Sequence, residues 1–185
     1  MHYMNHHVNT QLKNSPTTRP LPTGTWQLDP TETTIAVTAT KFGFFAVPAT
    51  LTVSSGSIVI DDDHRVTNVE VVAEAGSYTS RNPKRNTHIR SADFLDADNH
   101  PHLVFTAAQV TPDVDGYRAA GSVTVKGEAS PIEVDITNVE FDADRGTFTA
   151  TATVDRNAIG VGKLPSLVIA RRLQLKVTAT AVVDA

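Results

Sequence analysis

The sequence predicts an all-β fold: an antiparallel, up-and-down β-barrel of about eight strands with a short helix capping one end. Three observations predict it. Segments rich in Val, Ile and Thr alternate apolar with small polar residues, the period-2 pattern of strands with unlike faces. Turn residues separate these segments at short spacing. No helical segments alternate with the strands, which disfavours a parallel α/β sheet.

The strand pattern recurs along most of the chain. In order, the predicted strands are residues 34–40, 50–53, 57–60, 69–75, 102–107, 121–125, 132–137, 147–154 and 173–182. Turn signals fall between them at SSG (54–56), DDDH (61–64), the stretch 127–131, PDVDG (112–116) and DADRG (142–146).

Residues 1–23 differ in composition from the rest of the chain. They are rich in Asn, Thr, Ser and Pro, and we expect a disordered tail that precedes a barrel domain over residues 24–185. The tail histidines His2, His6 and His7 are interpreted as solvated and not as a metal site. The segment lacks the apolar core of a secretory signal, so a cytoplasmic location is expected.

One long connection, residues 77–101, interrupts the strands. Asn82 is a good N-cap and Pro83 a natural first helical residue, which predicts a short helix through about Arg90. Asp93 is expected to cap a single turn that carries Phe94 and Leu95. A connection of this length usually has a function, and we expect it to cover an open barrel end.

The predicted inward faces are rich in Ala, Gly and Val. In the segment 147–154, for example, Phe148, Ala150, Ala152 and Val154 share one face and threonines the other. Side chains this small favour a barrel that encloses a cavity for one small ligand, as in lipocalin-like barrels. The alternative is that the alanines lie between closely packed sheets with no cavity.

Composition and motifs disfavour several functions. The chain has no Cys, so disulfides and thiolate chemistry are excluded. Its net charge of −4 gives no sign of a nucleic-acid surface, and no stretch has the roughly 20 apolar residues of a bilayer span. Nucleophile-elbow, P-loop and dinucleotide-binding motifs are absent, which disfavours an enzyme. The alternative is a metal-dependent or other enzyme that uses His88, His100 and His102, although their spacing matches no zinc motif.

Aromatic residues gather in two regions. Phe42, Phe44 and Phe45 surround a glycine, while Phe94 and Phe105 lie in or just after the long connection. Two interpretations stay open: these side chains plug the barrel ends, or they line the mouth and walls of a lipid slot.

Four blocks of sequence resemble the YceI-like family of lipocalin-like, polyisoprenoid-binding proteins. The opening GTWQLDP (24–30) is similar to the family's Trp-x-Ile-Asp start. The strongest match is RNTHIRSADFLD (85–96) followed by HPHLVF (100–105), and then come GSVTVKGEASPIEV (121–134) and DRNAIGV (155–161). The chain departs from the family pattern at Asn86, Leu95 and Ile159, among others.

The resemblance implies non-covalent binding of a long-chain isoprenoid or acyl lipid, of polyprenyl or isoprenoid-quinone type, with no other cofactor. The expected ligand-binding residues are Phe42, Phe44, Phe45, Arg85, His88, Phe94, Leu95, Phe105, Phe148 and Arg156. Of these, Arg85, His88 and Arg156, together with Arg90, would orient the head group; the alternative for each is a surface salt bridge or a cap on a loop carbonyl. Peripheral membrane contact and a homodimer are further expectations, and a ligand-free structural domain is the remaining alternative.

Overall fold

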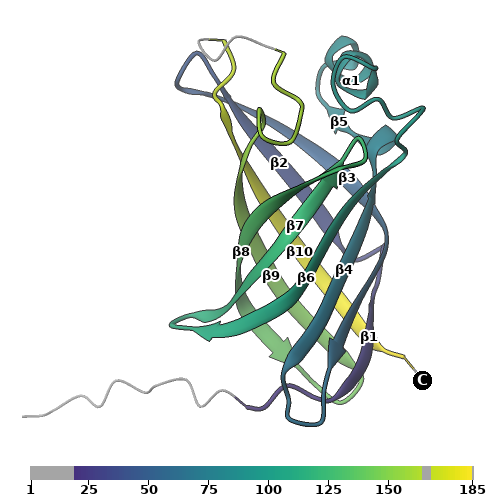
Figure 1. Ribbon diagram of the computed structural model, residues 1–185, viewed down its shortest axis with the longest axis vertical. Helices are drawn as coiled ribbons and strands as arrows, with labels where there is room; N and C mark the ends of the chain where they lie inside the picture. The colour runs from purple at the N-terminus through teal and green to yellow at the C-terminus, as the bar shows by residue number, and fades with distance from the viewer. Residues whose placement is uncertain (1–18, 164–167, 185) are drawn as a thin grey trace, which may run out of the picture.

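Eight antiparallel strands close into a barrel in the computed structural model, which describes residues 19–163 and 168–184 (Figure 1). Each strand pairs with the next along the chain, and the last pairs back with the first, so the prediction of an up-and-down barrel is confirmed. The strands are β2 (Thr34–Lys41), β3 (Phe45–Ile60), β4 (Val66–Glu74), β6 (His102–Asp113), β7 (Gly116–Val125), β8 (Glu128–Phe141), β9 (Arg145–Asp155) and β10 (Arg172–Val183).

The first strand, β1 (Gly24–Leu28), continues the line of β2 within the ring. It pairs with the end of β10 on one side and with the end of β3 on the other, where β2 does not reach. A turn separates the two strands, held by Asp29, whose side chain accepts hydrogen bonds from the backbone N and the hydroxyl of Thr31. One position in the barrel wall is therefore shared by β1 and β2.

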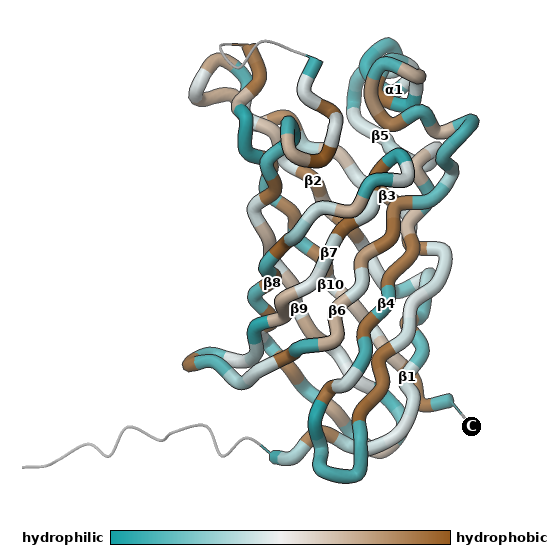
Figure 2. The backbone as a smooth tube through the Cα atoms, viewed as in Figure 1, coloured by the Kyte–Doolittle hydropathy of each residue, from teal (hydrophilic) through white to brown (hydrophobic). Residues whose placement is uncertain are grey.

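The two ends of the barrel carry different connections (Figure 1). The helix end holds α1 (Pro83–Arg90), the short elements η1 (Ala75–Ser77) and β5 (Thr79–Ser80), and the β2–β3 hairpin. The opposite end, here the Trp26 end, holds β1 and the β3–β4 turn, which is strongly hydrophilic in Figure 2. Within the described residues, no helix is long and apolar enough to cross a membrane.

One predicted turn is wrong and another is shorter than predicted. Residues 50–53 and 57–60 belong to one strand, β3, which continues through SSG with a register shift between Val53 and Ser55. Gly56 serves close packing here, because a Cβ at this position would lie 2.5 Å from Leu28 Cδ1. The turn assigned to residues 127–131 is confined to Lys126 and Gly127, both with positive φ, and β8 begins directly after it.

The Trp26 end has a filled interior. Trp26 is fully buried, and its ring meets Phe141 edge to face with centroids 4.9 Å apart. Around it pack Leu21, Leu28, Ile58, Ile60, Ala179 and Ala181. The predicted disordered tail lies outside the described residues up to residue 18, whereas Leu21 and Pro22 pack on the barrel. Leu21 is buried there, and the carbonyl of Pro22 accepts a hydrogen bond from Trp26 Nε1 at 3.2 Å.

Replacing this tryptophan tests the filled end. Trp26→Ala removes the largest fully buried side chain, so we expect a loss of about 3–5 kcal/mol in the free energy of unfolding. Urea unfolding followed by far-UV circular dichroism measures it. Gln27→Ala, at the exposed neighbour on the same strand, is the control and should change stability by less than about 0.5 kcal/mol. Equal effects of the two variants would contradict the packing described.

Candidate functional site

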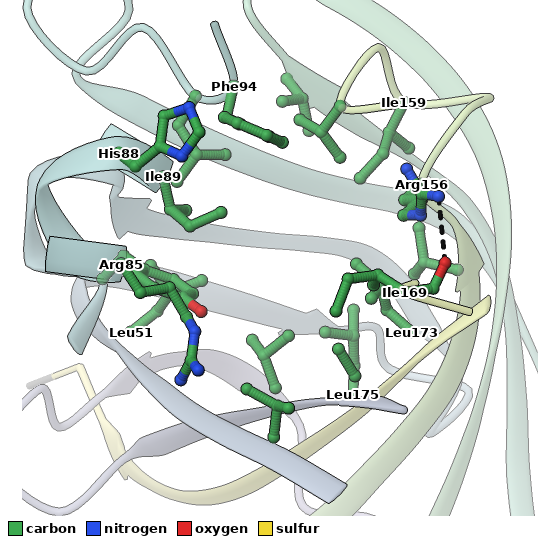
Figure 3. A pocket seen from close by; sticks show the side chains of 18 of the residues that line it. Leu51, Arg85, His88, Ile89, Phe94, Arg156, Ile159, Ile169, Leu173 and Leu175 are labelled. Atoms are coloured by element: carbon green, nitrogen blue, oxygen red, sulfur yellow. Dashed lines mark hydrogen bonds between the residues drawn. The ribbon is translucent and has the colours of Figure 1, made fainter. Parts of the chain in front are cut away.

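A cavity of about 480 Å³ occupies the interior at the helix end (Figure 3). Its walls are mostly apolar and come from β2, β3, β6, β7, β9 and β10, with further residues from the connections that cover this end. The strand residues that line it are Val37, Ala39, Lys41, Val47, Leu51, Leu103, Val123, Val125, Val154, Leu173 and Leu175. The helix end of the barrel is thus hollow, whereas the Trp26 end is filled.

Strand register explains why these side chains meet. Directly opposed residues of an antiparallel pair share a face. Leu175 is opposite Val37 of β2, and Leu173 is opposite Val154 of β9, so these four side chains all point into the barrel. The predicted inward face of residues 147–154, which includes Val154, is confirmed.

The source of the empty space differs from the expectation. The inward alanines Ala107, Ala119, Ala150 and Ala179 are at least 91% buried, and none of them lines the cavity. Among the described alanines, Ala39 alone is in the wall. The cavity is lined chiefly by Val, Leu and Ile, and among the described strands no aromatic residue contributes to its lining, whereas Trp26 fills the other end.

The helix over the cavity forms as the sequence predicts. Asn82 is the N-cap and its side chain accepts a hydrogen bond from the Arg85 backbone N, while Pro83 occupies the first helical position. The Asn86 amide exchanges hydrogen bonds with the backbone of Ser80 in β5, and β5 pairs with β3. Arg90 donates two hydrogen bonds to the Tyr78 carbonyl, at 2.9 and 2.6 Å. These contacts fix the helix to one side of the opening, so Arg90 holds the cap in place and does not line the cavity.

The turn after the helix places two apolar side chains in the cavity. Phe94 and Leu95 are buried and both line it. Asp93 does not act as the predicted second cap: its carboxylate accepts a 2.7 Å hydrogen bond from Lys163, and the backbone N of Phe94 bonds to the carbonyl of Ser91. The bond from Lys163 is the main cause that lowers the pKa of Asp93.

Arg156 lies in the wall and binds the chain itself. Its side chain is only 3% exposed, and it donates from Nε to the Ala170 carbonyl and from Nη2 to the Ile169 carbonyl, each at 3.1 Å (Figure 3). Ile169 forms a bridge with Lys41 of β2. Of the two roles considered for Arg156, the structure shows the cap on loop carbonyls. Through these bonds Arg156 ties the β9–β10 connection to the end of β9. Its neighbour Asp155 pairs with Arg171.

The polar lining gathers at the mouth. Lys84 and His88 are exposed, while Lys41 and Arg85 are half-buried, and all four line the cavity. The Arg85 side chain has one long contact, from Nη1 to Ser80 Oγ at 3.5 Å. Tyr78 lines the cavity beneath the helix, and burial raises the pKa of its phenol, which therefore stays neutral and able to donate a hydrogen bond. The arrangement is an apolar pocket with a cationic and hydroxylic rim.

The structure separates the predicted ligand-binding residues into two groups. Arg85, His88, Phe94, Leu95 and Arg156 meet in the cavity lining. The others lie elsewhere, for the following reasons.

The side chains of Phe42, Phe44 and Phe45 are exposed on the β2–β3 hairpin, so they neither plug the barrel nor line its wall. Phe105 is opposite inward-facing Val123, but its ring lies beside Gly121 and does not line the cavity. Phe148 packs against the filled core of the Trp26 end.

The three histidines of the enzyme alternative do not converge. His88 faces Asp93 at 3.9 Å, His100 faces Asp96 at 3.9 Å, and His102 faces Glu74 at 3.5 Å. In the part of the chain that the structure describes, no group of three or more metal-binding side chains comes together.

The sequence did not identify most of the aliphatic residues that line the cavity, because the expected ligand-binding residues were mainly aromatic or charged. Leu51, Leu103 and Leu173 carried a usable signal, because each is the first or second residue of a predicted alternating segment. Ile159, Val161 and Ile169 carried none, since they lie in the β9–β10 connection, where no periodicity places a side chain.

Comparison with known proteins gives a family and a shared fold. Residues 26–181 match the sequence profile of the YceI-like domain. A UPF0312 protein of Pectobacterium atrosepticum is 34% identical over 67 residues, 36% of this chain and 35% of that protein, so the chain matches about a third of the length of this relative. A UPF0312 protein of Yersinia enterocolitica is 28% identical over 81 residues, 43% of this chain and 42% of that protein.

Solved structures share the barrel at low sequence identity. BcnA of Burkholderia cenocepacia superposes with a TM-score of 0.74 at 18% identity, over 83% of this chain and 98% of BcnA. A polyisoprenoid binding domain from Saccharophagus degradans, implicated in plant cell wall breakdown, gives a TM-score of 0.63 at 12% identity, over 86% of this chain and 98% of that domain. At sequence identities this low, the two superpositions show that the fold is shared.

Replacing Arg156 tests its role in the wall. A lysine has one ammonium in place of a planar fork, so Arg156→Lys should lose one of the two carbonyl contacts and lower the free energy of unfolding by about 1–3 kcal/mol. Hydrogen exchange should also speed up at the Ala170 and Phe42 amides, which bond to Thr40 and Val168 across the same connection.

Arg85→Lys is the matched control, because the contact of the Arg85 side chain with Ser80 Oγ is long, at 3.5 Å, and stability should change by less than about 0.5 kcal/mol. Unchanged stability and unchanged exchange in Arg156→Lys would rule out the structural role.

Proposed function

Because the chain belongs to the YceI-like domain family, we propose that the cavity at its helix end binds a long-chain isoprenoid or acyl lipid, of polyprenyl or isoprenoid-quinone type, without covalent attachment. The protein would sequester or carry this lipid. The observation that carries the proposal is the cavity itself, a space of about 480 Å³ with a mostly aliphatic wall and a polar rim on one side.

The chemistry of the wall supports a hydrocarbon chain. The volume lies within the range of about 300–1,000 Å³ typical of ligand pockets. Each buried methylene contributes about 0.8 kcal/mol, so about fifteen of them give about 12 kcal/mol. Association itself costs about 4–15 kcal/mol, which explains why the ligand must have a long chain if the wall offers it few hydrogen bonds.

The rim supports a polar head group at the mouth. Arg85 and Lys84 bring positive charge there, and Tyr78 offers a neutral hydroxyl. We assign the head group to this rim and the chain to the space beside Leu51, Leu173 and Leu175 (Figure 3).

Filling the cavity should abolish binding without unfolding the protein. Leu175→Trp places a large ring in the cavity, and we expect at least tenfold weaker binding of geranylgeraniol or oleate, measured by titration calorimetry. The melting temperature should stay the same or rise, because the ring buries apolar surface in empty space. Lipid extracted from natively purified protein and detected by mass spectrometry should also disappear in this variant.

Gln174→Trp is the control, since residue 174 precedes Leu175 on β10 and faces solvent. It should bind as the wild type does. A Leu175→Trp variant that binds normally would place the ligand elsewhere. One that loses about 1–3 kcal/mol of stability would instead indicate an already filled interior.

The rim assignment predicts a head-group effect. Arg85→Met removes a mouth charge, so binding of the carboxylate oleate should weaken several-fold, while binding of the neutral alcohol geranylgeraniol should change less than twofold. Lys126→Met removes a charge at the same end but outside the cavity lining, and it should affect neither ligand. Equal losses for both ligands in Arg85→Met would argue against a head group at this arginine.

A further inference from the structure

Three exposed phenylalanines form a patch on the β2–β3 hairpin. Phe42, Phe44 and Phe45, called the Phe hairpin below, are 51%, 76% and 56% exposed, and the rings of Phe44 and Phe45 lie with centroids 4.4 Å apart. Among the described residues, the other two large apolar side chains that are exposed, Val114 and Val182, stand singly. Single exposed hydrophobic residues are ordinary, whereas a contiguous aromatic cluster marks an interaction surface.

The hairpin is held rigidly in this form. Phe42 and Gly43 both have positive φ, and the Phe44 backbone N bonds to the Lys41 carbonyl, so the two residues form a tight turn. Positive φ disfavours a bulky side chain, and Asn or Asp normally precedes Gly in such turns. The base of the hairpin is tied to the β9–β10 connection by bonds between Phe42 and Val168 and between Ala170 and Thr40. An aromatic residue is thus kept in an unfavourable backbone conformation at a position where it stays 51% exposed.

Charge is separated between the two ends of the barrel. Within the described residues, the connections at the helix end, taken with the strand residues that flank them, carry ten Lys and Arg against six Asp and Glu. The connections at the Trp26 end, taken in the same way and together with the terminal residues 19–24 and 183–184, carry three Arg against ten Asp and Glu. The chain as a whole has a net charge of −4, so the positive end stands out against an acidic molecule. An anionic surface would attract the helix end and repel the other.

The Phe hairpin adjoins the cavity mouth. Lys41 lines the cavity, and its Nζ lies 5.0 Å from the centroid of the Phe42 ring. The β2–β3 hairpin and α1 lie at the same end of the barrel (Figure 1). The Phe hairpin, the positive charge and the residues of the mouth therefore share one end of the molecule.

We infer that the helix end docks on an anionic lipid bilayer, with the Phe hairpin inserted among the lipids and the basic residues of the connections facing the head groups. The biological role of this docking rests on the proposed function. With the cavity mouth against the bilayer, a lipid would pass between bilayer and cavity without crossing water. Aromatic side chains suit the interfacial region, and basic residues nearby gain from the negative surface potential.

Vesicle flotation tests the docking. Wild-type protein should float with vesicles of phosphatidylglycerol and phosphatidylethanolamine and much less with phosphatidylcholine vesicles. The triple variant Phe42→Ser, Phe44→Ser, Phe45→Ser should bind the anionic vesicles at least tenfold more weakly and keep wild-type affinity for geranylgeraniol in solution. Val114→Ser removes an exposed apolar side chain at the opposite end and should bind vesicles normally.

A matched pair of charge reversals tests the electrostatic part. Arg81→Glu at the helix end and Arg65→Glu at the Trp26 end change the net charge equally, but only Arg81→Glu should weaken vesicle binding, by about threefold or more at low salt. Equal effects of the two reversals would overturn the oriented docking.

Three other results would also overturn the inference: wild-type protein that does not float, a serine triple variant that floats normally, or a wild-type dimer that this variant converts to monomers without any vesicle binding. Failure of the proposed function gives a different result, because a protein that floats but takes up no lipid in its cavity contradicts that function and leaves the docking intact.

Discussion

Closure of the sheet between β9 and β10 is the constraint on which the rest of the structure depends. Eleven residue pairs join these strands, from Arg172 opposite Asp155 to Val182 opposite Arg145. A ring of eight strands has an interior just wide enough for side chains to fill or for one small ligand to occupy. At one end β1 enters the wall and fills the interior with Trp26. At the other end β2 takes the same place with Val37 and Ala39, and the space stays open.

The cavity, its rim and its cover follow from that asymmetry. A hollow end needs a cover with its own polar groups satisfied, and α1 provides one through the bonds of Asn82, Asn86 and Arg90. Residues of the β9–β10 connection line the cavity as well, and Arg156 holds Ile169 and Ala170 of this connection in place. The proposed lipid would complete the apolar interior that the chain leaves unfilled, and the Phe hairpin and basic rim stand where such a lipid would enter.

Local chemistry made much of this predictable from the sequence. Alternation placed the faces of β9, and capping rules placed the start of α1 at Asn82 and Pro83. Long-range packing was not readable in the same way. Gly56 is typical of a turn in the sequence, but in the structure it makes room for Leu28 of another strand. The inward alanines predicted an empty interior, but they are buried by neighbouring side chains. Phe42, Phe44 and Phe45 share the apolar character of core residues, and only the path of the hairpin shows that they face solvent.

Methyl NMR on the protein titrated with geranylgeraniol tests most directly the claim that one half of the barrel is hollow and takes a hydrocarbon chain. The account predicts shifted methyl resonances and ligand contacts at Leu51, Leu173 and Leu175, with Leu28, Ile58 and Ile60 of the filled end unchanged. Contacts confined to the filled end, or a saturating titration that leaves the cavity methyls unmoved, would contradict it.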